Sequence, residues 1–403
     1  MSAARIPLSR VYQSEAIDRR ILEVVHGGNY ILGPECAAFE RELAAYFGVR
    51  HVVLASSWTA AVHLLHLAQV QLGQLKPGDE VLVPSLTAFP SVEPLIHAGA
   101  VPVFCDVDPA TYTIDVADAR RRVTPRTRGI LPVHLYGRPA NLDGVMKLAA
   151  DHGLWVVEDC AQAHGARYAG RRVGSVAAHA AFSFYPSKNL TVYGDGGAIA
   201  TADDEVAKLV RMLRNHGRAD KYLHEQVGFN LRFNEIQAAV GREQLKVLDR
   251  LNAGRRQAAA WYRRELAGVE GVTLPPADVG DEGAGGGAAG GAGISAGGSS
   301  TADPRTESVY HLFVVRLGNR DVRDGLARAL KSAGVETGVH YPVPNHQQPA
   351  IVGRFGPQAS LPVTEAYAGR ILSLPMFSSL TEDEVKVVAA EVRAFLGRDG
   401  GRE

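Results

Sequence analysis

Residues 51–69 read HVVLASSWTAAVHLLHLAQ, a short β-branched run followed by an apolar segment with helical spacing. The same alternation recurs where EVLVPS (80–85) precedes PSVEPLIHAG (90–99), and where LDGVMKLAADHG (142–153) precedes LWVVEDC (154–160). Strands that alternate with helices and are apolar throughout are typical of a parallel sheet buried on both faces. The sequence therefore predicts an α/β protein whose large domain has a mainly parallel sheet flanked by helices.

The second half of the chain changes in character. Residues 205–265 have the spacing of long helices, and residues 278–306 are a low-complexity run of Gly, Ala and Ser. Such a run has little apolar surface to bury, so we interpret it as a disordered surface loop. A strand, a helix and a last helix that begins at Thr381 follow. We predict a large domain over residues 1–250 and a smaller C-terminal α/β domain over residues 251–403.

Composition excludes several classes of function. Lys plus Arg and Asp plus Glu both total 43 in 403 residues, so no bulk charge would attract nucleic acid or an anionic membrane. Cys36, Cys105 and Cys160 lack the spacing of a metal site or of a disulfide framework. No stretch has the length of a membrane span or the pattern of a signal peptide. We expect a cytoplasmic protein with a small-molecule substrate and no metal.

Lys188 stands between an apolar run and a glycine-rich break in AFSFYPSKNLTVYGDGGAIA (181–200). A lone lysine usually does no more than solvate a loop. In open α/β sheets, however, ligand-binding residues gather at the carboxyl ends of the strands, and Lys188 follows such an end. A functional role for Lys188 is therefore indicated only if other reactive or ligand-binding groups lie at the same place.

Two other strand ends carry suitable groups. Glu158 and Asp159 end WVVED, where a carboxylate could cap a turn or could keep a heteroaromatic nitrogen protonated. Gln162, three residues on, could contact a phenolic oxygen of the same ring. Ser57 and Thr59 stand where a strand gives way to a helix, which suits either a simple N-cap or a phosphate.

An amine, a strand-end carboxylate, a phosphate cradle and the nearby Ser183 are together what pyridoxal phosphate requires. With these groups in these positions, the chain resembles the DegT/DnrJ/EryC1/StrS family of sugar aminotransferases. That family has the aspartate-aminotransferase fold, which is fold type I of the pyridoxal phosphate enzymes. The resemblance runs from about residue 10 to residue 395. It is carried in family order by SSWTAAVHL, VLVPSLTAFPSVEPLIHAGAVPVFCDVD, VHLYGRPANLD, VVEDCAQAHGA, SFYPSKNLTVYGDGGAI, NHGRADKY, GFNLRFNEIQAAVGREQL and VHYPVPNHQQP.

The resemblance implies a role for each site residue. Lys188 would form the Schiff base with the cofactor and serve as general acid and base, while Asp159 would pair with the ring nitrogen. Gln162 would lie against the ring hydroxyl and Phe89 on the ring face. The phosphate would be held by Ser57, Thr59 and Ser183, and by Asn230 from the second subunit of a homodimer with shared sites. Trp58 departs from the small residue common in the family, and we expect it to alter packing more than phosphate binding. Residues expected to face the substrate are His216, Lys221, Tyr222, His311, His340 and Tyr341.

The implied reaction moves an amino group from L-glutamate to a keto group of a nucleotide-linked deoxysugar, with pyridoxamine phosphate as the intermediate cofactor form. The segments around Tyr222 and Tyr341 resemble those of family members that aminate C3 of a dTDP-keto-hexose more than those that aminate C4. A keto-inositol acceptor is an alternative. Dehydratases of the family carry histidine in place of the lysine, so Lys188 favours amino transfer over dehydration. A regulatory protein without turnover is a further alternative, but no DNA-binding segment is apparent.

Overall fold

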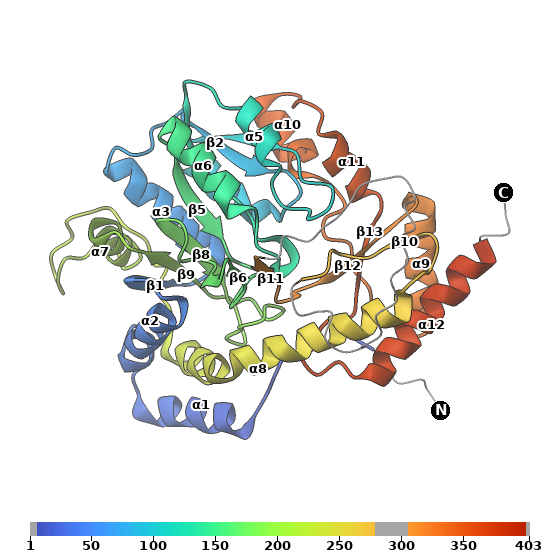
Figure 1. Cartoon of the computed structure of the whole chain (residues 1–403). Coiled ribbons are helices and arrows are strands. Elements are labelled where there is room, and N and C mark those ends of the chain that lie inside the picture. The colour runs from blue at the N-terminus through green and yellow to red at the C-terminus, as the bar shows by residue number, and fades with distance from the viewer. Residues whose placement is uncertain (1–5, 279–304, 400–403) are drawn as a thin grey trace.

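A computed structural model describes residues 6–278 and 305–399. Its centre is a seven-stranded sheet in the order β1-β9-β8-β5-β4-β2-β3 (Figure 1). The strands are β1 (His51–Ala55), β2 (Glu80–Pro84), β3 (Val101–Cys105), β4 (Thr127–Ile130), β5 (Trp155–Asp159), β8 (His179–Ser183) and β9 (Gly197–Thr201). Neighbours from β8 to β3 are parallel, whereas β9 runs antiparallel to both β8 and β1. The predicted mainly parallel sheet is confirmed, with β9 as its exception.

Helices cover both faces of this sheet. One face, which carries Val53 and Val157, packs against α3 (Trp58–Gln71) and α7 (Asp204–Leu213). The opposite face, which carries Leu54 and Phe182, packs against α2 (Pro34–Phe47) and the beginning of α8 (Glu235–Leu266). The remaining helices of this part are α1 (Glu15–Gly27), α2 (Pro34–Phe47), α4 (Glu93–His97), α5 (Val116–Arg121) and α6 (Leu142–His152), with short 3-10 turns η1 (Phe89–Ser91) and η2 (Leu135–Gly137). Burial on both faces explains why the strands are apolar throughout.

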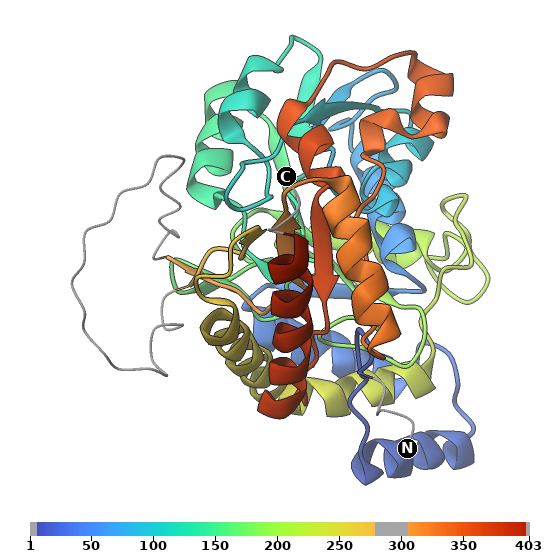
Figure 2. The same ribbon diagram turned by 90° about the vertical axis from the view of Figure 1, so that its right-hand side faces the viewer.

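The long helix α8 (Glu235–Leu266) leads from the central sheet and its helices, the first layer, to a smaller C-terminal unit, the second layer. There the sheet β10-β12-β13 packs against α9, α12 and the end of α8 around Tyr262 and Phe313. Figure 2 shows α9 and α12 side by side over this sheet. The elements are β10 (Val272–Thr273), β12 (Phe313–Leu317), β13 (Ile371–Leu374), α9 (Arg320–Ser332), η3 (Asn345–Gln347), α10 (Pro349–Phe355), α11 (Pro362–Ala368) and α12 (Glu382–Asp399).

The boundary expected at residue 250 lies inside α8, so this helix belongs to both layers. The N-terminal strand bridge between Ile6 and Val335 also joins the start of the chain to the second layer. A small third sheet, β11-β6-β7, is formed by β6 (Arg167–Tyr168), β7 (Arg171–Arg172) and β11 (Thr306–Glu307). Of the Gly/Ala-rich segment predicted as a disordered loop over residues 278–306, residues 279–304 lie outside the described residues. Its two ends are described: Asp278 is buried, and Thr306 belongs to β11. No described helix is both long enough and apolar enough to span a membrane.

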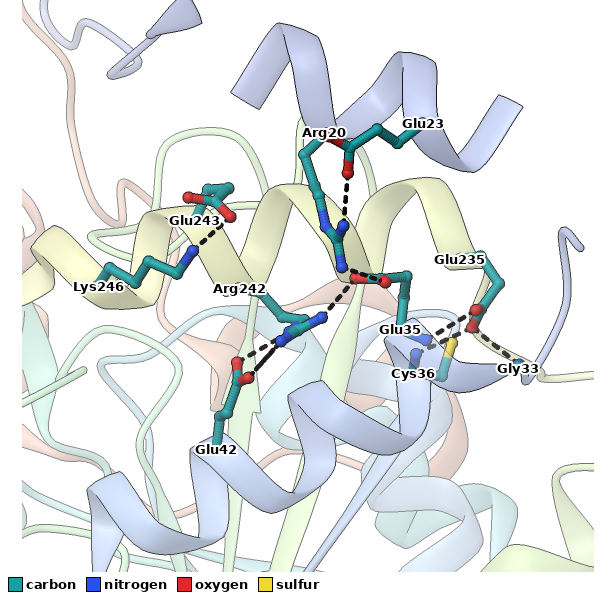
Figure 3. A network of polar contacts seen from close by, with 10 residues as sticks. All are labelled: Arg20, Glu23, Gly33, Glu35, Cys36, Glu42, Glu235, Arg242, Glu243 and Lys246. Carbon is teal, nitrogen blue, oxygen red and sulfur yellow. Dashed lines mark hydrogen bonds and ion pairs between the residues drawn. The ribbon is translucent and has the colours of Figure 1, made fainter. Parts of the chain in front are cut away.

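The beginning of α8 is fixed to α2 by a buried carboxylate (Figure 3). Glu235 accepts hydrogen bonds from the backbone N–H groups of Gly33, Glu35 and Cys36 at 2.8, 2.8 and 2.9 Å. A negative charge at the N-terminus of a helix is favourable, because free N–H groups and the helix dipole converge there. Arg242 joins the same contact by an ion pair to Glu35 at 2.8 Å. The segment that enters α8 is therefore held rigidly beside the central sheet.

Candidate active site

A cavity of about 220 Å³ opens at the carboxyl edge of the central sheet. Its walls come from the ends of β1, β2, β4, β5 and β8 and the segments that follow them, and from the turn that enters β9. Seven of the residues predicted for cofactor binding line it: Ser57, Trp58, Thr59, Asp159, Gln162, Ser183 and Lys188. The structure thus brings together groups that lie up to 131 positions apart, from 57 to 188.

Lys188 lies in the loop after β8, where its backbone N–H donates to the carbonyl of Tyr185 at 2.8 Å. Burial lowers the pKa of its amine to about 8, and the negative charge of Asp159 acts in the opposite direction. A larger fraction of the amine is therefore unprotonated near neutral pH than for an exposed lysine. An unprotonated amine is the form that attacks a carbonyl group.

Asp159 ends β5 and is 3% exposed. Its Oδ2 accepts from Ser91 Oγ at 2.8 Å, and its Oδ1 accepts from the backbone N–H of Ala161 at 3.0 Å. Burial raises the pKa of this carboxyl, while those two hydrogen bonds and the charge of Lys188 oppose the rise. A cationic N–H that enters the cavity would compensate the buried charge.

The N-terminus of α3 forms one wall of the cavity. Ser57 is the N-cap of this 14-residue helix, and its Oγ accepts from the backbone N–H of Ala60 at 3.0 Å. The hydroxyl proton of Ser57 remains available as a donor, because a hydroxyl both donates and accepts. The first backbone N–H groups of the helix, at Trp58 and Thr59, have no acceptor within the helix. Capping and anion binding are thus compatible at this position.

Gln162 links the cavity to the C-terminal part of the chain. Its Oε1 accepts from the backbone N–H of Tyr136 at 2.7 Å, and its Nε2 donates to the hydroxyl of Tyr341 at 3.1 Å. The preceding residue, His340, is held by a hydrogen bond between its Nδ1 and Ser373 Oγ at 2.8 Å. Burial and the charge of Lys188 lower the pKa of His340 to about 4. His340 and Tyr341 are therefore placed beside the cavity by β13 and Gln162.

The other predicted residues lie elsewhere in this chain. Phe89 lies between Ala88 and Pro90, which do line the cavity, and its side chain packs against the apolar cluster around β2 and β3. His311 precedes β12, is buried, and its Nδ1 lies 3.3 Å from Asn189 Oδ1. His216, Lys221, Tyr222 and Asn230 belong to the loop between α7 and α8, which projects at the left edge of Figure 1. Tyr222 is 80% exposed. Asn230 accepts from Arg232 Nε at 3.0 Å through its Oδ1.

Four further polar residues line the cavity that were not predicted as site residues: Thr87, Ser91, Tyr185 and Asp195. Of these, Thr87 and Tyr185 lie in stretches after strand ends where ligand-binding residues are expected. Ser91 is the most informative of them, because its hydroxyl orients Asp159. The two residues are 68 positions apart, and no local pattern indicates such a contact. The only feature of the sequence that pointed to Ser91 and Asp159 as site residues was that each follows or ends a strand.

His134, Glu158 and Cys160 form a buried cluster whose donor atoms lie within 4.8 Å of one another. Glu158 already accepts from the backbone N–H groups of Gly174, Val176 and Ala177 at 2.9, 2.9 and 2.7 Å. It also contacts His134 Nε2 at 3.1 Å. Backbone donors that converge on the carboxylate stabilise it in place of a cation. The cluster is therefore explained as a structural network.

Comparison with known proteins decides the family. The model of the DegT/DnrJ/EryC1/StrS aminotransferase family matches residues 12–393. The chain belongs to this family. The dTDP-3-amino-3,4,6-trideoxy-alpha-D-glucose transaminase of Streptomyces venezuelae is 44% identical over 381 residues, which are 94% of this chain and 92% of that protein. The UDP-N-acetyl-3-dehydro-alpha-D-glucosamine 3-aminotransferase of Acidithiobacillus ferrooxidans is 39% identical over 374 residues, 93% and 92% of the two chains.

A solved structure agrees with these relatives. The crystal structure of S. venezuelae DesV is 42% identical to this chain, covers 97% of it over 98% of its own length, and superposes with a TM-score of 0.84. The fold predicted from the resemblance, that of the pyridoxal phosphate-dependent sugar aminotransferases, is confirmed. The protein is a sugar aminotransferase of the DegT/DnrJ/EryC1/StrS family that depends on pyridoxal phosphate.

The groups of the cavity fit this cofactor. Lys188 supplies an amine for an aldehyde, and the buried Asp159 supplies a carboxylate that lacks a full countercharge. Hydroxyls at Ser57, Thr59 and Ser183 surround the N-terminus of α3, where backbone N–H groups favour a phosphate. Each charged or reactive end of the cofactor thus has a chemically matched partner on the cavity wall.

Proposed function

We propose that this aminotransferase moves an amino group from L-glutamate to the 3-keto group of a nucleotide-linked deoxysugar. The observation that carries the proposal is the juxtaposition of Lys188 with Asp159 in one cavity. The names of the two similar relatives both refer to position 3 of the sugar, one on a dTDP sugar and one on a UDP sugar. This agreement supports C3 over C4, and their shared class of substrate supports a nucleotide sugar over a keto-inositol.

Lys188 and Asp159 carry the chemistry. Bound pyridoxal phosphate supplies a ring that withdraws electrons from the carbon that loses or gains a proton. Asp159, oriented by Ser91 and Ala161, would keep the ring nitrogen protonated. Lys188 would hold the cofactor through its amine. The same amine, when free, would carry a proton between the substrate carbon and the cofactor on one face of the site.

Other residues position the cofactor. Ser57, Thr59 and Ser183 would donate to its phosphate, together with the backbone at the start of α3. Gln162 uses one N–H for Tyr341, which leaves its second N–H for the ring hydroxyl. Phe89 would reach the ring from the segment that contributes Ala88 and Pro90.

We further propose that the active enzyme is a homodimer. The loop between α7 and α8 exposes Tyr222, Leu223 and Val227 at 80%, 54% and 94%. Large apolar side chains exposed together favour coverage by another protein surface. In a symmetric dimer this loop would bring Asn230 to the phosphate of the second subunit, and His216, Lys221 and Tyr222 to its substrate. His311, His340 and Tyr341 would approach the substrate from the same chain as Lys188.

The proposed function is tested by product formation. The purified enzyme, loaded with pyridoxal phosphate, is incubated with L-glutamate and one of three acceptors: a dTDP-3-keto-deoxyhexose, a dTDP-4-keto-deoxyhexose or a keto-inositol. New amines are detected by mass, and their position by NMR. We expect the 3-amino sugar as the main product. Amination of only the 4-keto sugar or the keto-inositol would contradict the proposal.

A further inference from the structure

Asn189, the residue after Lys188, is 4% exposed and uses its whole side-chain amide. Its Nδ2 donates to Asn252 Oδ1 at 2.8 Å and to the backbone carbonyl of Val309 at 2.9 Å. Its Oδ1 lies 3.3 Å from His311 Nδ1. The residue next to the catalytic lysine is therefore bonded to α8 and to the segment before β12.

Asn252 continues this chain of hydrogen bonds. It lies on α8, is 1% exposed, and donates from Nδ2 to the backbone carbonyl of His164 at 2.8 Å. The chain passes so close at the next residue, Gly165, that a Cβ there would lie 2.9 Å from Asn252 Nδ2. Gly165 also has φ +87°, which glycine adopts without strain. Glycine at this position allows the contact between His164 and Asn252.

Two backbone carbonyls determine how both amides are oriented. A carbonyl oxygen only accepts hydrogen bonds, so Asn252 must present its NH₂ group to His164. Its oxygen then faces Asn189, which in turn must present its NH₂ group to Asn252 and Val309. The oxygen of Asn189 is left facing His311. An oxygen that accepts requires a proton on the Nδ1 of that imidazole.

We infer that Asn252 and Asn189 hold His311 in the neutral form protonated on Nδ1, so that its Nε2 is a hydrogen-bond acceptor. The inference rests on the proposed role of Lys188. His311 is 5% exposed, and burial lowers its pKa well below the ordinary value, with the charge of Lys188 acting in the same direction. A neutral imidazole is therefore the stable form at this position.

The tautomer has a chemical consequence. An Nε2 lone pair accepts a hydrogen bond from an ammonium or a hydroxyl group but cannot donate one. A neutral His311 therefore adds no second positive charge to the surroundings of Lys188, whose charge already lowers the pKa of this imidazole. Asn252 touches neither group and acts only through Asn189, so it is a positioning residue.

The tautomer can be measured on the cofactor-free protein by NMR with ¹⁵N-labelled histidine, because protonated and unprotonated ring nitrogens have well-separated shifts. The signals of His311 are assigned with His311→Gln. At pH 7 we expect a proton on Nδ1 and none on Nε2. A proton on Nε2, or a doubly protonated ring, overturns the inference. The measurement does not depend on turnover, so it is independent of a failure to find the proposed substrate.

Two substitutions test whether the hydrogen bonds between Asn252 and Asn189 and between Asn189 and His311, here called the relay, fix the tautomer of His311. Asn189→Leu removes the acceptor for His311, and we expect mixed tautomers and a kcat about tenfold to a hundredfold lower, with a smaller change in KM. Asn252→Leu, which leaves Asn189 bonded to Val309, should have the same effects in weaker form. An unchanged His311 signal with an unchanged kcat in Asn189→Leu contradicts the relay. If neither variant folds, the wild-type spectrum still decides.

Gln69→Leu is a matched control. His66 Nδ1 lies 2.8 Å from Gln69 Oε1 on α3, and both residues are 0% exposed. This pair has the same chemistry as His311 and Asn189 but lies outside the cavity wall described above. We expect Gln69→Leu to shift the His66 signals alone and to leave kcat unchanged. A similar loss of kcat in this control would indicate that any disturbed buried histidine slows the enzyme.

Discussion

Glu158 and Asp159 are neighbours at the end of β5, but their side chains make contacts on opposite sides of the sheet. Glu158 is enclosed by three backbone N–H groups and His134, whereas Asp159 borders the cavity of Lys188. The alternation of side chains along a strand separates the two carboxylates. The contacts of Glu158 are structural, whereas Asp159 is the one proposed for catalysis, although both are almost completely buried.

Glu158→Gln should destabilise the fold without altering the cavity. A glutamine has one oxygen for the donors that Glu158 now serves, and its NH₂ group would face another backbone N–H. We expect a loss of about 3 kcal/mol in the free energy of unfolding, measured by urea denaturation. Glu23→Gln, at a carboxylate that is 52% exposed, should change it by less than about 1 kcal/mol.

The pH dependence of this effect has a definite sign. Burial alone would raise the pKa of Glu158, but hydrogen bonds from His134, Ala177 and Gly174 outweigh it and lower the pKa below 4.5. Such a carboxylate stabilises the fold above the unfolded pKa, and this contribution is lost as the pH falls through the folded pKa. Wild-type stability should therefore decline below about pH 4.5 more steeply than that of Glu158→Gln. Parallel pH profiles would show that Glu158 is not the group responsible.

Lys188 should react with amine reagents at an unusually low pH. In cofactor-free protein, the rate of labelling by fluorodinitrobenzene, followed by peptide mass, should rise with a midpoint near the pKa of about 8. Asp159→Asn should move the midpoint lower, because the carboxylate raises the pKa of the amine. A midpoint near 10.5, the ordinary value, would show that burial does not act on this amine as described.

The parts predicted from the sequence are those with local signals. The β1–α3 unit was visible because a buried strand and the N-cap Ser57 lie within a few residues of each other. The helix start predicted at Thr381 is confirmed by a capping box, in which Glu384 N–H donates to Thr381 Oγ1 at 3.2 Å and Thr381 N–H donates to Glu384 at 2.8 Å. The antiparallel direction of β9 had no such signal, because periodicity is the same for both directions.

The same limit applies to the site. Lys188, Asp159 and Ser57 follow strand ends and could be predicted from that position. Ser91 and Asn252 could not, because they act through contacts with Asp159 and Asn189 that span 68 and 63 positions. Side chains that orient other side chains are set by the tertiary fold, and one sequence does not show them.

Trp58→Phe should have little effect on stability. Trp58 is 6% exposed in the cluster between the sheet and α3, and its indole N–H has no hydrogen-bond partner among the described residues. Loss of an unpaired buried donor is favourable and loss of ring volume is not, so we expect a net change within about 1 kcal/mol. Trp58→Ala should cost about 3–5 kcal/mol. A tenfold weaker affinity of Trp58→Phe for pyridoxal phosphate would show instead that the indole N–H contacts the cofactor.

Mixed dimers should recover activity if Asn230 acts across subunits. Lys188→Ala chains and Asn230→Ala chains are expected to be inactive and strongly impaired, respectively. After joint refolding, heterodimers would contain one site with both residues intact, so about a quarter of all sites would be restored. Differently tagged chains allow the heterodimer to be isolated. No recovery in isolated heterodimers would place Asn230 and Lys188 of one chain in the same site.

A half-reaction separates amino transfer from dehydration. The enzyme loaded with pyridoxal phosphate and given only L-glutamate should release 2-oxoglutarate, up to one equivalent per site, because Lys188 can yield its place to the amine of the donor and then move the proton. Lys188→Ala should release none, whereas Lys147→Ala, at a lysine that is 72% exposed on α6, should behave like the wild type. The keto acid is measured with a coupled dehydrogenase in a single turnover. Release of no keto acid from L-glutamate would contradict L-glutamate as the donor, and release of none from any common amino acid, with cofactor binding demonstrated, would contradict the role assigned to Lys188.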